Sequence, residues 1–331
     1  MIKVLVTGVG GGVGQSILKS FQDSQYLVVG VDGERLGTGL YAVTKAYTIP
    51  YAVDPSFVDK ILDICTSEGC SLIFPGMDAE LPVLSQHMNV FKQKDIIPVV
   101  SSEEVINISD DKLATYQFLT NHGFYAPLTV DLSQWQINNL KFPLVLKPRR
   151  GGARSRGVHV VHNLKEFDIV LTTLNLDNYV AQEHIEGEEY TCGSVNFNGH
   201  CYGPIIMRRI LRDGDTYKAF VVSNPPLENY IRTVAEELQP FGACNFQLRL
   251  KKDKPFVFEI NARCSGTTYA RTLAGFNEPV MVADYLLHGK IPTYEIRYIS
   301  ILRYWKELVV ENPRIERLKQ LGKIEGDGSE L

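Results

Sequence analysis

The chain has 331 residues, of which 44% are hydrophobic and 22% charged, and its formal net charge is -4. This composition is typical of a globular protein of about two domains, and it excludes disordered, collagen-like and disulfide-stabilised miniprotein classes. Without a basic excess, neither nucleic acid nor a membrane is expected as a partner, and no apolar run approaches the ~18 residues of a membrane helix. The six cysteines form no Cys-x-x-Cys pair, and the first apolar run is too short for a signal peptide, so we expect a cytoplasmic protein.

Strands and helices alternate along the first third of the chain. Buried strands are predicted at 3–7, 27–31, 71–74 and 97–100, and helices at 15–21, 56–67 and 79–91. This alternation is typical of a parallel sheet with helices on both faces. The sequence therefore predicts a Rossmann-like domain over residues 1–108.

A glycine cluster follows the first predicted strand, with glycines at positions 8, 11 and 14. Such a turn lets backbone N–H groups approach a phosphate, and Asp32 ends the next strand, where a ribose-binding acid would stand. The spacing Gly-x-Gly-x-x-Gly is missed, however, because position 13 is valine. Two interpretations stay open: the dinucleotide site of an NAD(P)-dependent oxidoreductase, and a tight turn in which glycine serves close packing.

The pattern changes after the helix-capping cluster at 109–111, which precedes a helix ending near 121. Alternating strands are predicted at 144–147, 158–161, 179–183, 191–197, 201–206, 218–223, 243–250 and 256–261, and helices at 164–174, 227–239 and 279–288. These elements indicate an antiparallel-rich α+β module over residues 109–295. Residues 296–331 are expected to add one strand and a frayed tail.

The strongest chemical signal lies in the two late strands joined by residues 251–255. A hairpin symmetric about Asp253 places Gln247 opposite Glu259 and Asn245 opposite Asn261. Strand alternation predicts a polar face of Val257, Glu259 and Asn261 and a core face of Phe256, Phe258 and Ile260. One carboxylate among amide oxygens suits Mg²⁺, which keeps waters and takes further ligands from substrate phosphates. The alternative is a solvated face of an edge hairpin.

Two further segments point to a nucleotide. Lys147 ends a strand and precedes a loop rich in glycine and arginine, which is suited to cradling phosphates and is not a Walker loop. The segment from Gln182 to Ile185 leads to a bend at Gly187, whose backbone groups could read a purine edge, and Glu189 could accept ribose hydroxyls. Taken singly, the first segment could be a mobile basic loop and the second a charged turn.

In this order the three segments resemble the ATP-grasp superfamily, and they most resemble one half of the carbamoyl-phosphate synthase large subunit. The resemblance runs from the first strand to Lys290, and Pro75 to Leu81 is similar to the family's Pro-x-x-Asp-x-Glu-Leu segment. It implies an N-terminal Rossmann-like domain followed by an ATP-grasp domain at 109–295, with a lid at about 112–180 and a core at about 181–295. ATP and Mg²⁺, or Mn²⁺ in its place, are the implied cofactors.

The resemblance also implies residue roles. Nucleotide contacts would come from Lys112, Lys147, Gly151, Gly152, Ser155, Gly157, Gln182, Glu183, His184, Ile185 and Glu189. Metal ligands would be Gln247, Glu259 and Asn261. Arg263 would steady an acyl phosphate, Arg209 would face the substrate, and Lys147 would also neutralise charge during the reaction.

The implied reaction is ATP-dependent phosphorylation of a carboxylate or bicarbonate to an acyl or carboxy phosphate, which an amine then attacks. Because the chain has room for one such unit, we expect a homodimer or a partner subunit that supplies ammonia or a second ATP-grasp unit. The arginines at 150, 154 and 156 depart from the family pattern and suggest an additional anionic group. Besides the oxidoreductase, the rival interpretation is a non-catalytic nucleotide sensor, which would not need the full set of Glu259, Asn261 and Arg263.

Overall fold

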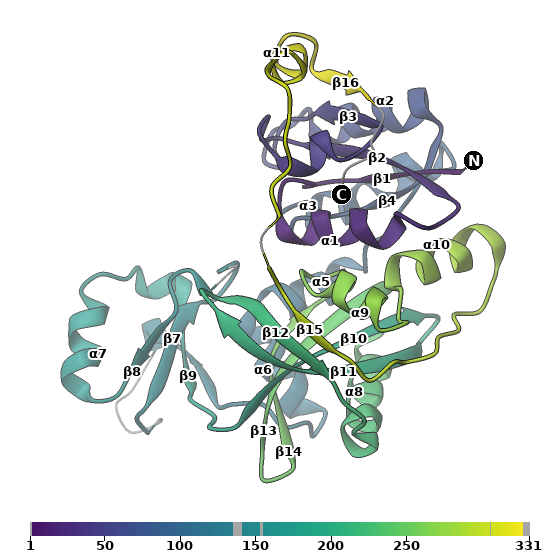
Figure 1. The fold of residues 1–331 in the computed structure, drawn as a ribbon. Helices are drawn as coiled ribbons and strands as arrows, with labels where there is room; N and C mark the ends of the chain where they lie inside the picture. Colours follow the sequence, from purple (N-terminus) through teal and green to yellow (C-terminus); the bar gives the residue numbers. More distant parts are fainter. Residues whose placement is uncertain (1, 135–140, 153–154, 305, 327–331) are drawn as a thin grey trace.

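The computed structural model describes residues 2–134, 141–152, 155–304 and 306–326, which form three sheets (Figure 1). The first sheet has the order β16-β3-β2-β1-β4-β5. Its parallel strands are β1 (Ile2–Val6), β2 (Tyr26–Asp32), β3 (Lys45–Thr48), β4 (Cys70–Phe74) and β5 (Ile97–Pro98). Around it lie α1 (Gly12–Phe21), α2 (Phe57–Glu68), α3 (Glu80–Gln86), α4 (Met88–Lys92) and the 3-10 turn η1 (Thr38–Tyr41). The predicted Rossmann-like sheet is confirmed, and β3 is an additional strand.

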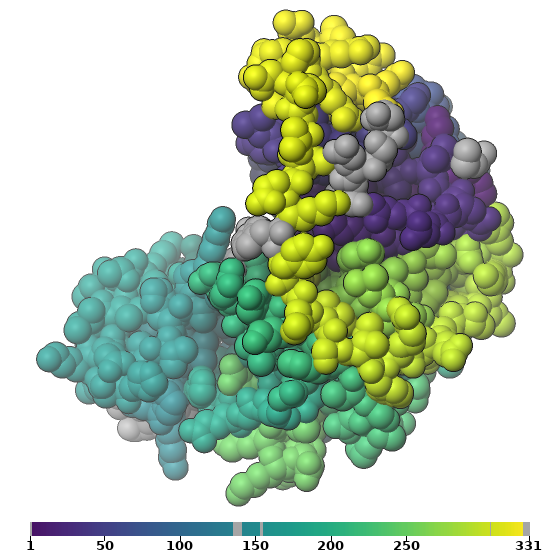
Figure 2. All heavy atoms as spheres, in the orientation of Figure 1, coloured from purple at the N-terminus to yellow at the C-terminus, as the bar shows by residue number. Residues whose placement is uncertain are grey.

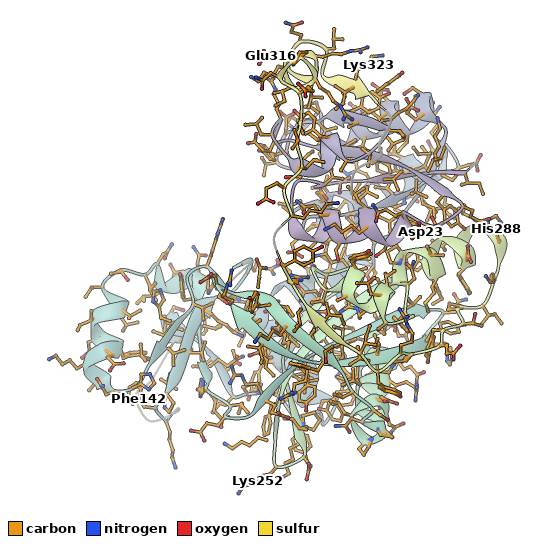
Figure 3. The ribbon with its side chains drawn as sticks, viewed as in Figure 1. Asp23, Phe142, Lys252, His288, Glu316 and Lys323 are labelled. Atoms are coloured by element: carbon orange, nitrogen blue, oxygen red, sulfur yellow. The ribbon has the colours of Figure 1, made fainter. Side chains whose placement is uncertain are left out.

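The second sheet is small and antiparallel, with the order β6-β9-β7-β8. Its strands are β6 (Thr129–Asp131), β7 (Leu144–Pro148), β8 (His159–Val161) and β9 (Tyr179–Glu183), accompanied by α7 (Leu164–Leu171), η2 (Leu132–Gln134) and η4 (Leu176–Asn178). Leu144, Leu146 and Phe167 pack in a core that belongs to this sheet alone. It forms a separate lobe at the left of Figure 2, where Figure 3 labels Phe142. From here on the name lid is used for this lobe alone, that is, for the described residues between 129 and 183.

The third sheet has six strands, like the first, in the order β14-β13-β10-β11-β12-β15. Its strands are β10 (Glu188–Phe197), β11 (His200–Arg212), β12 (Asp215–Val221), β13 (Gly242–Lys251), β14 (Lys254–Asn261) and β15 (Ser300–Leu302). The helices of this part are α5 (Glu103–Asp110), α6 (Lys112–Asn121), α8 (Pro225–Leu238), α9 (Thr268–Leu273) and α10 (Glu278–His288). The antiparallel α+β module that the sequence predicts is confirmed.

Helix α1 joins the first domain to the rest of the molecule by lying against α9 and α10 (Figure 1). Ile17 and Phe21 of α1 belong to the same buried cluster as Phe276 and Met281. Polar contacts cross the same boundary, because the Ser20 and Thr272 hydroxyls lie 2.8 Å apart. A shared apolar core is what holds two domains in a fixed relation, so the first domain can contribute side chains to a site on the second.

The β13–β14 hairpin confirms the predicted register at its functional end. Asn245 pairs with Asn261 and Gln247 pairs with Glu259. A β-bulge between Gln247 and Leu248 then shifts the pairing nearer the turn, whose tip is labelled by Lys252 in Figure 3. The extra residue reverses the expected alternation: Val257 is fully buried in the core, whereas Phe258 lines a cavity. The predicted assignment of these two residues to faces was therefore wrong.

The end of the chain returns to the first domain instead of fraying after one strand. The yellow segment in Figure 2 crosses from the core to the first domain, where α11 (Asn312–Leu321) precedes β16 (Lys323–Glu325). Strand β16 pairs antiparallel with β3, and Leu318 and Ile324 are buried. These two apolar side chains anchor the segment up to residue 326; residues 327–331 of the expected tail lie outside the described residues. Within the described ranges, no helix has the length and apolarity needed to cross a membrane.

Glu80, at the start of α3, fixes the turn after β4 and carries a testable pH dependence. It accepts hydrogen bonds from the Thr7 hydroxyl and, at 3.2 Å, from the Met77 backbone N–H. Burial raises the pKa of Glu80 to about 7, although these hydrogen bonds oppose the rise. The folded chain therefore holds a proton that the unfolded chain releases, so this group costs stability as the pH rises from its ordinary pKa toward 7.

We expect Glu80→Gln to remove that cost. The free energy of unfolding of the variant minus that of wild type should increase by up to about 3 kcal/mol when the pH rises from about 5 to about 8. Urea unfolding of both proteins at the two pH values measures the shift. An equal difference at both values would contradict the buried, protonated state of this carboxyl.

Candidate active site

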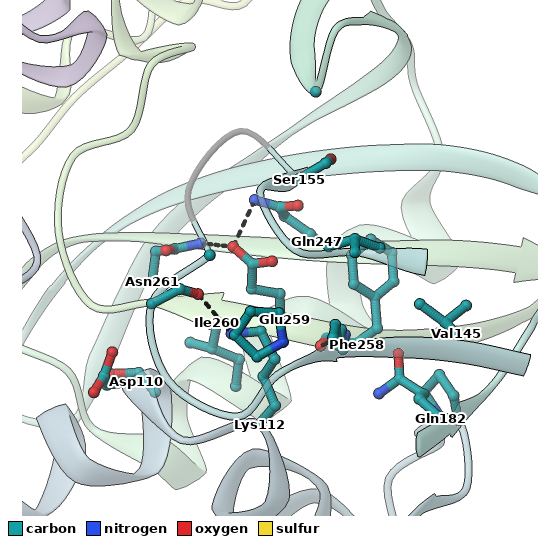
Figure 4. A pocket seen from close by; sticks show the side chains of 18 of the residues that line it. Asp110, Lys112, Val145, Ser155, Gln182, Gln247, Phe258, Glu259, Ile260 and Asn261 are labelled. Carbon is teal, nitrogen blue, oxygen red and sulfur yellow. Dashed lines mark hydrogen bonds between the residues drawn. The ribbon is translucent and has the colours of Figure 1, made fainter. Parts of the chain in front are cut away.

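One cavity lies where the lid, the third sheet and the first domain meet (Figure 4). It is lined by every site residue that the sequence predicts except Gly157. These are Lys112, Lys147, Gly151, Gly152, Ser155, Gln182, Glu183, His184, Ile185, Glu189, Arg209, Gln247, Glu259, Asn261 and Arg263. They come from α6, β7 and its following loop, β9, and strands β10, β11, β13 and β14. Segments far apart in the chain are thus brought to one place.

The loop after β7 is anchored at its base by arginines. Arg149 Nε lies 2.8 Å from Asp111 Oδ2, and Arg150 NH1 lies 3.0 Å from Asp110 Oδ2. Lys112 Nζ donates to the Gly151 carbonyl at 2.9 Å. Arg150 thus pairs within the protein, which gives it a structural role that the sequence had not revealed.

Gly157 closes the same loop without lining the cavity. Its φ is +72°, and a Cβ atom there would lie 2.5 Å from the Tyr179 hydroxyl. Glycine is therefore required for the loop's return to β8. Arg156 is exposed, and Arg154 lies outside the described residues.

Lys147 is a buried basic side chain in the wall of the cavity. Its side chain is only 5% exposed, and its Nζ donates to the Phe258 carbonyl at 3.4 Å. Burial, together with the nearby Lys112 charge, lowers the pKa of Lys147 to about 7, although Glu259 opposes this. An ammonium in this position is stabilised by an arriving anion, because the anion supplies the charge that the buried site lacks.

This gives an expected pH effect on nucleotide binding. A bound phosphate raises the pKa of Lys147, so binding takes up a proton, and affinity is full below about pH 7 and declines above it. At about pH 8 the uptake attributable to this group should approach about 0.9 proton per nucleotide. Calorimetry in buffers of different ionisation enthalpy measures it. Lys147→Met should abolish this uptake; an unchanged uptake in that variant would contradict the assignment.

Next to β9, the cavity has one polar side chain with a hydrogen-bond partner and one buried polar atom without a partner among the described residues. Gln182 Nε2 donates to the Thr129 hydroxyl at 2.8 Å, which leaves its amide fixed in place. His184 Nδ1 is buried and has no hydrogen-bond partner among the residues that the structure describes. Burial, and then the Arg249 charge, lowers the pKa of His184, so the ring is neutral near neutral pH. A buried polar atom without a partner at this bend is suited to a ligand that supplies one.

Glu189 is held between two arginines. Its Oε1 accepts from Arg209 NH2 at 2.6 Å, and its Oε2 accepts from Arg249 NH2 at 2.8 Å. Arg209 NH2 also lies 2.6 Å from Gln247 Oε1. Arg209 thus connects the position predicted for ribose with the positions predicted for metal.

Glu259 is the carboxylate at the other end of the cavity. Gln247 Nε2 and Asn261 Nδ2 donate to its Oε1 at 3.2 Å and 3.0 Å, as the dashed lines in Figure 4 show. Within the described ranges, no three His, Cys, Asp or Glu side chains converge in a way that could hold a metal. A metal here would therefore depend on Glu259, amide oxygens and ligands brought by the substrate.

Arg263 is paired with a residue of the first domain. Its Nε and NH2 each lie 2.6 Å from a carboxylate oxygen of Asp78, and its NH2 lies 3.2 Å from Asn261 Oδ1. Burial opposes ionisation of Asp78, but the Arg263 charge holds the pKa of Asp78 below its usual value. Asp78 lines the same cavity, and sequence reasoning missed it as a site residue although it lies in the quoted Pro-x-x-Asp-x-Glu-Leu segment.

The glycine cluster at the start of the chain is packed against the protein itself. Asp32, the residue suggested for ribose, accepts from the Gly10 N–H at 2.6 Å and the Glu34 N–H at 2.8 Å. A Cβ atom at position 14 would lie 2.2 Å from the Gly8 carbonyl oxygen. These contacts favour the interpretation of a tight turn that needs glycine for close packing.

Comparisons with known proteins agree with this architecture. Residues 175–306 match the family described as ATP-grasp in the biosynthetic pathway with Ter operon, and residues 4–100 match the PylC-like N-terminal domain. The chain is 27% identical over 245 residues to the D-alanine–D-alanine ligase of Bacillus anthracis, covering 65% of this chain and 79% of that protein. It is 23% identical over 261 residues to the carbamoyl phosphate synthase large chain of Lachnoclostridium phytofermentans, covering 73% of this chain but only 24% of the relative.

A solved structure shares the fold at low identity. The biotin carboxylase domain of the Hydrogenobacter thermophilus 2-oxoglutarate carboxylase, in complex with MgADP, ADP and bicarbonate, aligns with a TM-score of 0.67 and 17% identity. The alignment covers 89% of this chain and 72% of that one. The PylC-like match covers most of the first domain, and the ATP-grasp match covers the third sheet but little of the lid. Residues 175–306 are therefore an ATP-grasp domain, and residues 4–100 are a PylC-like N-terminal domain.

Proposed function

We propose that this protein is an ATP- and Mg²⁺-dependent ligase that phosphorylates a carboxylate or bicarbonate and joins the product to an amine. One observation carries the proposal: the residues predicted for nucleotide, metal and acyl phosphate, Gly157 excepted, line a single cavity. The D-alanine–D-alanine ligase relative joins a carboxylate to an amine, and the carboxylase neighbour was solved with MgADP and bicarbonate. Both support the same reaction class.

The residues present fit ATP. Lys112 and Lys147 supply positive charge beside the loop after β7, and Lys147 is buried where an anion would stabilise its ammonium form. At the other end, the unpartnered His184 Nδ1 offers a polar contact within a wall that includes Val145, Phe258 and Ile260. Apolar walls with a few fixed polar groups are typical of nucleotide pockets.

The donor set also fits Mg²⁺. Glu259 supplies one carboxylate and Asn261 an amide, and hard oxygen donors of this kind, completed by phosphate oxygens and water, are what Mg²⁺ takes. When bound, the ion would neutralise the negative charge that develops on the phosphates during transfer.

The chain's own side chains would then position the reacting groups and stabilise the charge that develops on them. Lys147 and Lys112 would hold the transferred phosphoryl group, and Arg263 would face the acceptor carboxylate from the end of β14. Phosphoryl transfer needs alignment and charge stabilisation more than a side-chain nucleophile, so none is required. The anchored loop after β7 would help to exclude water from the acyl phosphate.

The likeness to carbamoyl-phosphate synthase supports a narrower proposal. The chain corresponds to about a quarter of that relative's length, as one phosphorylating unit would. We propose that it acts as a single unit of this kind, either on bicarbonate with partner subunits or on a different carboxylate by itself.

The test is a screen of carboxylates and amines for ATP-dependent ADP release, with mass detection of the joined product. We expect at least one pair to raise ADP release and to yield a product that contains both partners. A chain that binds ATP and releases no ADP with any pair would favour the nucleotide sensor instead.

A further inference from the structure

The amide of Gln247 has an orientation that its neighbours dictate. Arg209 has only hydrogen-bond donors, so the Gln247 atom that lies 2.6 Å from Arg209 NH2 must be the oxygen. The amide nitrogen is then the atom that faces Glu259 Oε1 at 3.2 Å. Gln247 therefore presents N–H, and not oxygen, to the metal carboxylate.

Arg209 is firmly held in the position from which it binds this oxygen. Its side chain is 10% exposed, and its Nε and NH2 lie 3.0 Å and 2.6 Å from Glu189 Oε1. Glu189 is 12% exposed and is braced on its other oxygen by Arg249. A charge-assisted pair with this little exposure is costly to separate, because separation leaves two buried charges without partners.

Asn261 makes an instructive contrast. Its Oδ1 lies 3.2 Å from Arg263 NH2, while the shorter bonds of Arg263, at 2.6 Å, go to Asp78. Asn261 can therefore turn its oxygen toward an ion without breaking a strong pair. Gln247 cannot do so unless its much shorter contact with Arg209, at 2.6 Å, is broken.

We propose that Gln247 is a positioning residue and not a metal ligand. Arg209 binds the Gln247 amide oxygen and keeps it from the ion, while the Gln247 N–H orients Glu259. Glu189, predicted to bind ribose, and Glu259, predicted to bind metal, are therefore linked through Arg209 and Gln247. The inference rests on the proposed MgATP site and changes which residues of that site hold the ion. Glu259, with Asn261 and the nucleotide phosphates, remains as the ligand set.

The test is a double-variant cycle that reads Mn²⁺ affinity and not activity. Free Mn²⁺ is followed by electron paramagnetic resonance in the presence of a non-hydrolysable ATP analogue, for wild type, Gln247→Met, Arg209→Met and the double variant. If Arg209 keeps the Gln247 oxygen from the ion, Arg209→Met makes that oxygen available. The loss of Mn²⁺ affinity caused by Gln247→Met should then be at least about tenfold larger in the Arg209→Met background than in wild type.

Equal costs in both backgrounds, within about threefold, would overturn the proposal. Arg208→Met is the matched control, because Arg208 lies next in the strand but pairs with the exposed Glu188, so it should show no such coupling to Gln247. Binding of the analogue without metal is measured in parallel. Absence of analogue binding in wild type would count against the proposed function, whereas normal binding with equal costs would count only against this inference.

Discussion

Replacing Glu259 with glutamine should lower ATP turnover by about 10²–10³-fold, because the cavity then loses the carboxylate that two amides orient and that we propose as a metal ligand. Nucleotide affinity measured without metal should change little, since Lys112 and Lys147 are untouched. The measurements are steady-state ADP release and binding of a non-hydrolysable ATP analogue with and without Mg²⁺.

The matched control for this prediction is Glu188→Gln, the same change on an exposed side chain of β10 that does not line the cavity. It should leave turnover near the wild-type value. Turnover that survives in Glu259→Gln would contradict the metal assignment, provided that both variants unfold at the wild-type temperature.

Replacing Arg271 with methionine should lower the free energy of unfolding by about 3–5 kcal/mol. Arg271 and Glu278 are both fully buried, with Arg271 Nε 3.0 Å from Glu278 Oε2. Arg271 also donates to Asn245 Oδ1 and to the hydroxyls of Thr267, Ser265 and Thr268. The single change leaves a buried carboxylate without its cation, and the loop after β14 loses its anchor.

The control is the double variant Arg271→Met with Glu278→Leu, measured by urea unfolding. Removing both charges should cost less than the sum of the two single changes, because no buried ion is then left unpaired. Additive costs, or a loss below about 1 kcal/mol for Arg271→Met, would show that the ion pair does not stabilise the fold as the structure indicates.

The hairpin shows what sequence periodicity can and cannot predict. The pairing of Gln247 with Glu259 follows from strand alternation and the position of the turn, and it is confirmed. The bulge beside Gln247 has no signature in the residue types, so the faces of Val257 and Phe258 were wrongly assigned. Local pattern predicts register well, but one inserted residue reverses everything on its far side.

Ion pairs between residues far apart in the sequence are a second feature that residue patterns do not predict. Asp78 and Arg263 are 185 residues apart, and nothing in either segment alone predicts that they meet. Arg150 likewise pairs with Asp110 at the end of α5, so a charge that suggested a substrate anion has a partner within the chain. The first pair depends on how the two domains dock, and the second on how the loop after β7 lies against the end of α5; residue patterns specify neither.

We propose that the cavity between the lid, the third sheet and the first domain binds MgATP. Calorimetric titration of wild type and Lys147→Met with a non-hydrolysable ATP analogue, with and without Mg²⁺ and with NADH in parallel, tests it most directly. We predict one Mg²⁺-dependent analogue site per chain, strongly weakened in Lys147→Met, and no comparable binding of NADH. This proposal would be contradicted by an analogue affinity that changes neither with Mg²⁺ nor in Lys147→Met, or by tight binding of NADH in place of the analogue.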